Sequence, residues 1–130
     1  MPSKSENLFL YEYAVVRYSA RVEREEFVNV GLLMMCKRRR WIRARFAVNE
    51  ARIKAMFADK ADIPCLLGQL EAFSSIAGGN APVIGALEAE ERFRWLTAVR
   101  SACLSTSRPH PGKTSDLDAA FSRLFAELVE

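Results

Sequence analysis

The chain has 130 residues, of which 50% are hydrophobic and 27% are charged, a composition typical of one folded domain. This composition excludes a disordered or low-complexity chain, because so many apolar residues can form a core. The longest apolar run, Val30 to Cys36, is far shorter than the about 20 residues of a membrane-spanning helix. The polar N-terminus lacks the apolar stretch of a signal peptide, so we expect a cytoplasmic protein.

The formal net charge of +3 is unevenly distributed along the chain. Residues 17–60 contain 12 Lys and Arg against 5 Asp and Glu, a local excess of +7, whereas the remainder carries −4. Such an asymmetry is compatible with an acidic partner and also with a role in solubility.

The cysteines Cys36, Cys65 and Cys103 are widely spaced, and His110 is the sole histidine. A structural zinc site uses four Cys or His ligands in short paired spacings, which this chain lacks. We therefore expect buried free thiols, no metal site and no cofactor.

We expect a disordered tail over residues 1–9 and a single domain over residues 10–130. The β-branched and aromatic residues of Tyr11–Tyr18 predict a first strand that is apolar on both faces near its middle. Phe27–Cys36 predicts a second strand, in which Gly31 marks a bulge or a close approach of the backbone.

Apolar and polar residues alternate over Trp41–Val48, which predicts a third strand with Ile42 on its apolar face and Arg43 on the other. The basic residues Lys37–Arg40 would form an exposed turn between the second and third strands. The two strands would therefore make a hairpin, which argues against an all-parallel sheet.

Asn49 is a suitable N-cap for a short helix over Glu50–Phe57, and Asp62 for a second helix over Ile63–Ala77. Apolar residues in the second helix recur at spacings of three and four, which predicts one buried stripe. Gly78–Gly79 would end this helix.

Glu88–Leu96 predicts a short helix or turn, and Ala98–Ser105 a fourth strand. Two prolines and a glycine in Ser107–Gly112 predict a loop, and Asp116–Val129 has the spacing of a final amphipathic helix. This order predicts the α+β class, with an antiparallel sheet of three to four strands and helices packed mainly on one face.

The most distinctive stretch is Glu25–Gly31, because the polar Glu26 and Asn29 interrupt an otherwise apolar segment. One interpretation is a polar site at the end of a strand. The other is structural: Asn29 would bond to a neighbouring backbone and Gly31 would permit a bulge.

Three motifs occur in order, Tyr13–Tyr18 (YAVVRY), Glu25–Gly31 (EEFVNVG) and Glu91–Leu96 (ERFRWL), and together the chain resembles a bacterial family known only as a domain of unknown function. The resemblance implies bacterial origin but no chemistry. Its members often lie beside genes for kinase-like proteins of the toxin–antitoxin type, which implies a protein partner. The segment Arg108–Pro111 is more proline-rich than the family's loop, which puts any role of His110 in doubt.

The candidate binding residues are polar or aromatic side chains within or beside the apolar segments: Arg17, Glu26, Asn29, Arg94 and Trp95. An unpaired charge is costly to bury, so we expect Arg17, Glu26, Asn29 and Arg94 to converge near one end of the sheet. Arg and Trp are also frequent at the energetic centres of protein interfaces. The alternative is that Arg94 makes a purely structural ion pair with Glu26 or Glu91.

A basic hairpin supplies the alternative nucleic-acid-binding set, namely Lys37, Arg38, Arg39, Arg40, Trp41, Arg43 and Arg45. Such residues can neutralise phosphates and stack a base, and we expect the six charges to form one exposed ridge. The other interpretation is a charged turn that keeps the hairpin soluble and blunts the edge of the sheet.

A nucleophilic site would need His110 as the base, with Cys103, Ser105 or Ser107 nearby in sequence. Arg100–Ser101 and Ser105–Ser107 are a weak candidate for binding an anion through hydroxyl groups. The sequence favours a non-catalytic binding or accessory domain acting through a protein partner, such as a kinase-like protein encoded nearby. The alternatives are a nucleic-acid-binding module and a metal-independent enzyme.

Overall fold

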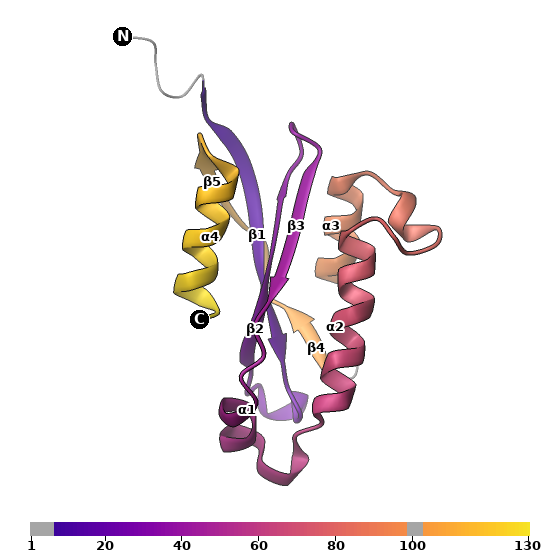
Figure 1. Ribbon diagram of the computed structural model, residues 1–130, viewed down its shortest axis with the longest axis vertical. Helices are drawn as coiled ribbons and strands as arrows, with labels where there is room; N and C mark the ends of the chain where they lie inside the picture. Colours follow the sequence, from indigo (N-terminus) through magenta and orange to yellow (C-terminus); the bar gives the residue numbers. More distant parts are fainter. Residues whose placement is uncertain (1–6, 99–102) are drawn as a thin grey trace.

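In the computed structural model, which describes residues 7–98 and 103–130, an antiparallel sheet lies between helices on its two faces (Figure 1). Its strands are β1 (Phe9–Tyr18), β2 (Val28–Cys36), β3 (Trp41–Phe46), β4 (Leu104–Thr106) and β5 (His110–Thr114). They are arranged β3–β2–β1–β4, and β5 also pairs with β1. The predicted α+β class and antiparallel sheet are confirmed.

The long strand β1 is central because it pairs along both of its edges. One edge pairs with β2, whereas the other is shared by β4, which faces Val16–Tyr18, and β5, which faces Phe9–Tyr13. The strand begins two residues earlier than predicted, so Phe9 belongs to the sheet and not to the tail. Residues 1–6 of the predicted tail lie outside the described residues.

The predicted hairpin of β2 and β3 is confirmed, with Cys36 opposite Trp41 and the exposed turn Lys37–Arg40 between them. A bulge interrupts the pairing of β2 with β1. Val16 lies opposite Gly31 and Arg17 opposite Asn29, so one extra residue of β2 is accommodated between them.

The bulge changes which side chains of β2 share a face. Val28 and Val30 enter the same core as Leu33 and Met35, although strict alternation would place the two pairs on opposite faces. A Cβ atom at Gly31 would lie 2.4 Å from Cδ1 of Phe46. Gly31 therefore marks both the predicted bulge and a close approach.

The C-terminal part of the sheet differs from the prediction at two places. The predicted strand Ala98–Ser105 is confirmed only at Leu104 and Ser105, which lie in β4; Ala98 ends a helix, and residues 99–102 lie outside the described residues. The predicted loop Ser107–Gly112 is also wrong in part, because β5 begins at His110. Proline is tolerated in β5 because only one of its edges pairs, and the ring of Tyr11 lies against the backbone of Gly112.

The helices are α1 (Glu50–Phe57), α2 (Ile63–Ala77), α3 (Ala89–Ala98) and α4 (Leu117–Leu128). The side chains of Asn49, Asp62 and Asp116 accept hydrogen bonds from the first-turn amides of α1, α2 and α4, as expected for N-caps. Within residues 7–98 and 103–130, each helix is too short or too polar to cross a bilayer.

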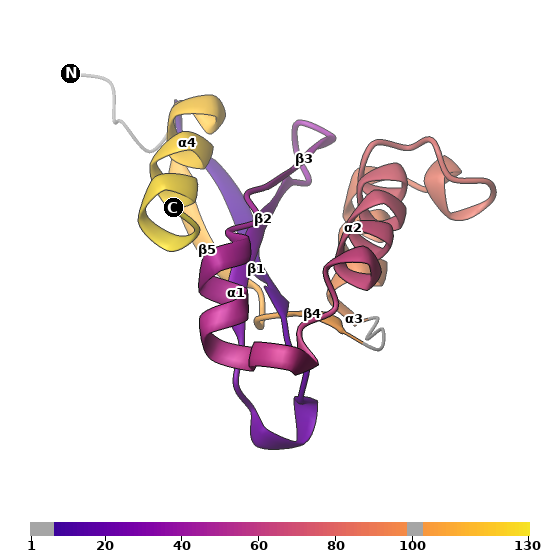
Figure 2. The ribbon, with the colours of Figure 1, turned by 60° about the horizontal axis from the view of Figure 1, so that its bottom comes forward.

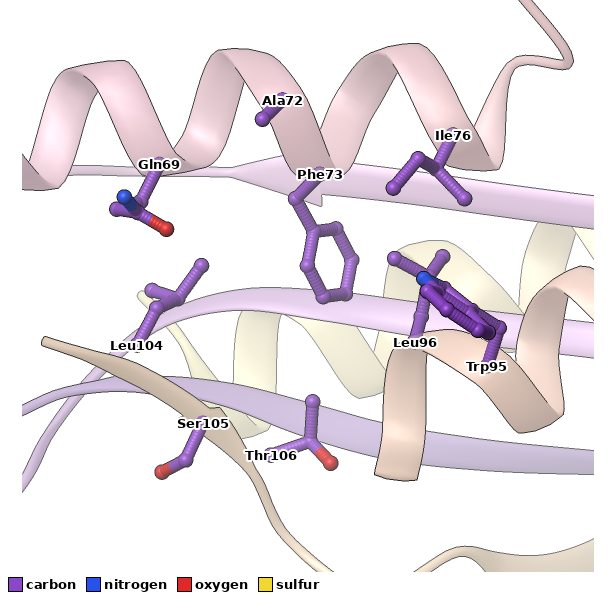
Figure 3. A pocket seen from close by; sticks show the side chains of 9 residues that line it. All are labelled: Gln69, Ala72, Phe73, Ile76, Trp95, Leu96, Leu104, Ser105 and Thr106. Atoms are coloured by element: carbon purple, nitrogen blue, oxygen red, sulfur yellow. The ribbon is translucent and has the colours of Figure 1, made fainter. Parts of the chain in front are cut away.

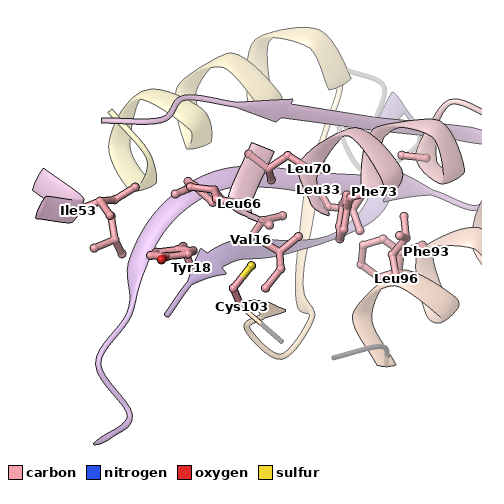
Figure 4. Packing of buried hydrophobic residues seen from close by; sticks show 14 of the residues in the cluster. Val16, Tyr18, Leu33, Ile53, Leu66, Leu70, Phe73, Phe93, Leu96 and Cys103 are labelled. Atoms are coloured by element: carbon pink, nitrogen blue, oxygen red, sulfur yellow. The ribbon is translucent and has the colours of Figure 1, made fainter. Parts of the chain in front are cut away.

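The two faces of the sheet carry separate cores (Figures 1 and 2). As predicted for most helices, α1, α2 and α3 share one face, where Tyr18, Leu66 and Phe93 are almost fully buried (Figure 4). The helix α4 covers the opposite face, with Phe121 at the centre of its core. We call these the α1–α3 face and the α4 face.

Candidate functional site

Arg94 lies on the α1–α3 face and pairs with Glu12 of β1. Its Nη1 donates to Oε1 of Glu12 over 3.0 Å, and Nη2 donates to the other carboxylate oxygen. The hydrogen bonds to Glu12 raise the pKa of Arg94, against the opposing effect of burial. This fork-like pair ties α3 to β1, a partner that the sequence did not indicate because 82 residues separate the two.

Arg17 and Asn29 lie side by side near the other end of the sheet, on the α4 face. The guanidinium of Arg17 lies 5.3 Å from the ring centre of Phe27. Nδ2 of Asn29 donates a 3.0 Å hydrogen bond to the carbonyl oxygen of Leu128, in the last turn of α4. These contacts match the structural interpretation of the motif Glu25–Gly31.

The predicted convergence of the four polar residues is therefore wrong. Glu26 pairs with Arg24, and Arg94 lies with Glu12 on the opposite face from Asn29. Arg17 lies five positions after Glu12 along β1, which corresponds to about 16 Å. The sequence could not show this, because the bulge and the strand register decide which face each polar residue occupies.

Trp95, another candidate, lies at the rim of a pocket of about 90 Å³ between α2, α3 and β4 (Figure 3). Its side chain is 44% exposed, although it is large and apolar. Phe73 projects from α2 toward the sheet, and Leu104 points from β4 toward α2. The full lining is Gln69, Ala72, Phe73, Ile76, Trp95, Leu96, Leu104, Ser105 and Thr106.

The chemistry of this Trp95 pocket is neutral and mainly apolar, because no residue of its lining is charged. Gln69, Ser105 and Thr106 supply polar groups at its edges. Such a pocket can take up an apolar side chain while the indole stacks against it. The sequence indicated Trp95 but not the lining from α2 and β4, which only the packing brings together.

The neighbouring Arg92 has a structural role. Its Nε donates to the carbonyl oxygen of Leu87 over 3.0 Å, and its Nη1 donates to the carbonyl oxygen of Ala77 over 2.6 Å. These bonds join the start of α3 to the C-terminal end of α2, so Arg92 holds together two of the elements around the Trp95 pocket.

All six charged residues of the basic hairpin are exposed, as predicted, but Arg43 and Arg45 also contact α4. Arg43 packs over the rings of Trp41 and Phe121 and pairs with Asp118 at 2.6 Å, while Arg45 lies over Phe125. These arginines cover the edge of the α4 core while remaining exposed to solvent. Trp41 is likewise held edge-on against Phe121.

The turn itself is exposed, but two of its charges are engaged. Lys37 pairs with Glu90 at 3.5 Å, and Arg39 lies 5.1 Å from the ring centre of Phe9. Arg38 lines a shallow hollow of about 520 Å³ together with Lys37, Lys113 and the apolar Leu8 and Leu10. Three cationic side chains therefore line this hollow.

The contacts of His110 and Ser107 do not join these two side chains in a nucleophilic arrangement. The ring of His110 lies 5.3 Å from that of Tyr13, its cross-strand partner. The hydroxyl of Ser107 accepts from the amide of Val15 and donates to the carbonyl oxygen of Arg108. Thr106 lines the Trp95 pocket, whereas Arg100 and Ser101, proposed as anion-binding residues, lie outside the described residues.

The three cysteines are free, as expected, and Cys36 and Cys103 are buried, whereas Cys65 is only partly buried. Cys65 and Cys103 are neighbours, whereas Cys36 is buried in the other core. Among the described residues, no group of three or more His, Cys, Asp or Glu side chains could hold a metal ion.

The chain belongs to a protein family of unknown function, DUF3037, whose model matches residues 13–129. This confirms the resemblance to a domain of unknown function over nearly the whole chain. No curated protein and no solved structure matches the chain. The family has no known activity, so a function must be argued from the surfaces of the molecule.

Proposed function

We propose that this domain is a non-catalytic binding or accessory module that docks a protein partner through the Trp95 pocket. The observation that carries the proposal is the 44% exposure of Trp95 beside an uncharged, mainly apolar pocket. An exposed indole next to a preformed apolar pocket is a frequent centre of binding energy. The partner would insert one apolar side chain between α2, α3 and β4.

The polar candidate residues are held in contacts within the protein, which supports a binding role rather than catalysis. Arg94 is held by Glu12, Asn29 by the last turn of α4, and Ser107 by the backbone of β1. A general acid or base must instead face a pocket where a substrate can reach it. A metal-independent enzyme using Glu26, Asn29 and Arg94 is disfavoured because these residues do not share a pocket.

The first partner to test is a kinase-like protein encoded beside the gene, as the family resemblance implies. Its affinity should be measured calorimetrically with the wild-type domain and with Trp95→Ala. Loss of a central interface side chain typically costs at least about 2 kcal/mol, so we expect affinity to fall about thirtyfold. Leu67→Ala is the matched control, because Leu67 is 53% exposed on α2 but does not line the pocket.

Photocrosslinking tests the same surface without a chosen partner. A photoreactive phenylalanine at Ala72, in the pocket lining, should give one specific protein adduct that Trp95→Ala removes. The same residue at Ala126, exposed on α4, should give none. Equal adducts from both positions, or an adduct that survives Trp95→Ala in a folded protein, would contradict the proposal.

Nucleic-acid binding remains the second candidate because of the hollow beside the turn. Arg38 and Lys113 line it with Lys37, and three cations near one another could contact phosphates. Two leucines share this hollow, however, and the pairing of Lys37 with Glu90 reduces its positive charge.

A further inference from the structure

Two cysteines that are far apart in the sequence meet between α2 and the start of β4. Cys65 lies in the first turn of α2, and Cys103 directly precedes β4. Their Sγ atoms are 3.2 Å apart, and both cysteines are free. A disulfide has an S–S distance of about 2.05 Å, so the two sulfurs need to approach by little more than 1 Å.

The two thiols differ in their access to solvent. Cys65 is half-buried, whereas Cys103 is only 7% exposed and projects into the α1–α3 core near Tyr18 and Leu66 (Figure 4). Burial, followed by the hydrogen bond with Cys65, raises the pKa of Cys103 to about 12. Cys103 is thus kept as a thiol at neutral pH, and Cys65 is the sulfur that a reagent in solution reaches first.

We infer that Cys65 and Cys103 form an oxidative modification site, at which a peroxide converts the two thiols to a disulfide linking α2 to the start of β4. The pair is distinct from a chance surface cysteine, because two sulfurs from separate elements already touch. Cys36 takes no part, since it is fully buried in the core of the α4 face.

The chemistry proceeds in two balanced steps. The sulfur of Cys65 attacks one oxygen of hydrogen peroxide, so that an S–O bond forms and the O–O bond breaks. The hydroxide that is released takes up the thiol proton of Cys65 and becomes water. The sulfur of Cys103 then attacks the sulfenic sulfur, so the S–S bond forms and the S–O bond breaks. The departing hydroxide takes the proton of Cys103 as a second water, and the two electrons lost by the sulfurs reduce the peroxide.

The bond would constrain the walls of the Trp95 pocket, a consequence that rests on the proposed docking function. Gln69 lies one helical turn after Cys65 on α2, and Leu104 directly follows Cys103. Both residues line the pocket, so a covalent link between α2 and β4 would fix the distance between these two walls. Oxidation would thereby alter the affinity for an inserted side chain.

Peroxide treatment of the full chain tests the modification itself. We expect a mass loss of two hydrogens, a single cross-linked peptide pair containing Cys65 and Cys103, and one thiol that remains after denaturation. The rate at which the sulfur of Cys103 closes the disulfide should increase with pH, because more of Cys103 is then ionised. Dithiothreitol should reduce the disulfide and restore both thiols. A Cys36→Ala variant should behave as the wild type, whereas Cys65→Ala should give no cross-link.

Three outcomes would overturn the inference: sulfinic acid at Cys65 without a bond, a disulfide that includes Cys36, or three intact thiols. The variant Cys103→Ala should likewise give no cross-link. If this variant fails to fold, the wild-type protein before and after oxidation serves as its own control. Partner affinity is then measured on both forms. If the disulfide forms but the affinity for the partner does not change, oxidation does not control docking. If the affinity is instead insensitive to Trp95→Ala, the proposed docking function is wrong, but the modification site is unaffected.

Discussion

The two faces of the sheet are closed in different ways. On the α1–α3 face, helices from three separate segments meet over β1 and β2, and the space between α2, α3 and β4 is left as the Trp95 pocket. On the α4 face, a single amphipathic helix covers the strands, and Arg43 and Arg45 lie over the rings of Phe121 and Phe125.

This difference bears on where an uncharged apolar pocket remains between the elements. Arginine side chains can cover aromatic rings with their planar groups while remaining partly in water. On the α4 face, Arg43 and Arg45 of β3 pack in this way against the rings of α4. The junction of several helices is harder to fill completely, because each helix packs at its own angle. An apolar pocket therefore occurs on the α1–α3 face, whereas Arg43 and Arg45 on β3 are exposed but already contact the rings of α4.

The largest losses of stability are expected when a large buried side chain is removed from either core. Phe93→Ala on the α1–α3 face and Phe121→Ala on the α4 face remove rings that are 0% and 1% exposed. Each should lower the free energy of unfolding by about 3–5 kcal/mol, measured by urea denaturation. The exposed control Leu67→Ala should stay within about 0.5 kcal/mol of the wild type. If one phenylalanine variant matches this control, the corresponding face is not a structural core.

A smaller effect is expected at the bulge that assigns side chains to the two faces. Gly31→Ala would place a Cβ atom 2.9 Å from the carbonyl oxygen of Arg45 as well as against Phe46. We expect a loss of about 1–3 kcal/mol in unfolding free energy from this overpacking.

The same substitution at Gly68 is the matched control, because nothing lies within 4 Å of a Cβ atom there. Gly68→Ala should stabilise α2 by about 0.5–1 kcal/mol, since alanine favours helix. Thermal unfolding of both variants should therefore shift in opposite directions. Equal shifts would show that the close approach at Gly31 is not a constraint.

Alkaline pH should gradually lower the free energy of unfolding, through two titratable groups in the core of the α1–α3 face. Burial is the main cause that raises the pKa of Cys103 from 9.0 to about 12 and that of Tyr18 from its usual 10.0. Between these values the unfolded chain has lost protons that the folded chain retains, so unfolding releases protons and is favoured as the pH rises. The stabilisation is complete below pH 9 and is lost as the pH rises toward 12.

Thermal midpoints measured between pH 8 and pH 10.5 check this dependence. Cys103→Ala removes one of the two groups, so its midpoint should fall less steeply with pH than that of the wild type. Parallel curves for the two proteins would indicate that Cys103 does not contribute.

The smallest effect is expected for nucleic-acid binding by the basic hairpin. If about five of its charges contacted phosphates, affinity for duplex DNA would fall by two to three orders of magnitude between 50 and 200 mM salt. We expect no such retention, because Arg43 and Arg45 are packed against α4 and Lys37 is paired with Glu90. Salt-dependent retention that Arg38→Glu with Arg40→Glu abolishes would contradict this and favour the second candidate function.

Local features of the fold could be predicted because their causes lie among neighbouring residues. The N-caps Asn49 and Asp62 each bond to an amide three residues away, so their role is visible in any short window. The hairpin of β2 and β3 likewise follows from two apolar runs on either side of a charged turn. The glycine at the bulge was recognisable because it interrupts an apolar strand.

The candidate site depended on contacts that only the tertiary structure decides. Arg94 meets Glu12 and Cys65 meets Cys103 across 82 and 38 residues of chain, and nothing local specifies either pair. The strand β5 was missed because proline is unfavourable only where a paired amide is needed, and an edge strand removes that need. Strand register and the bulge assign each polar side chain to a face, and a one-residue change in register would exchange them.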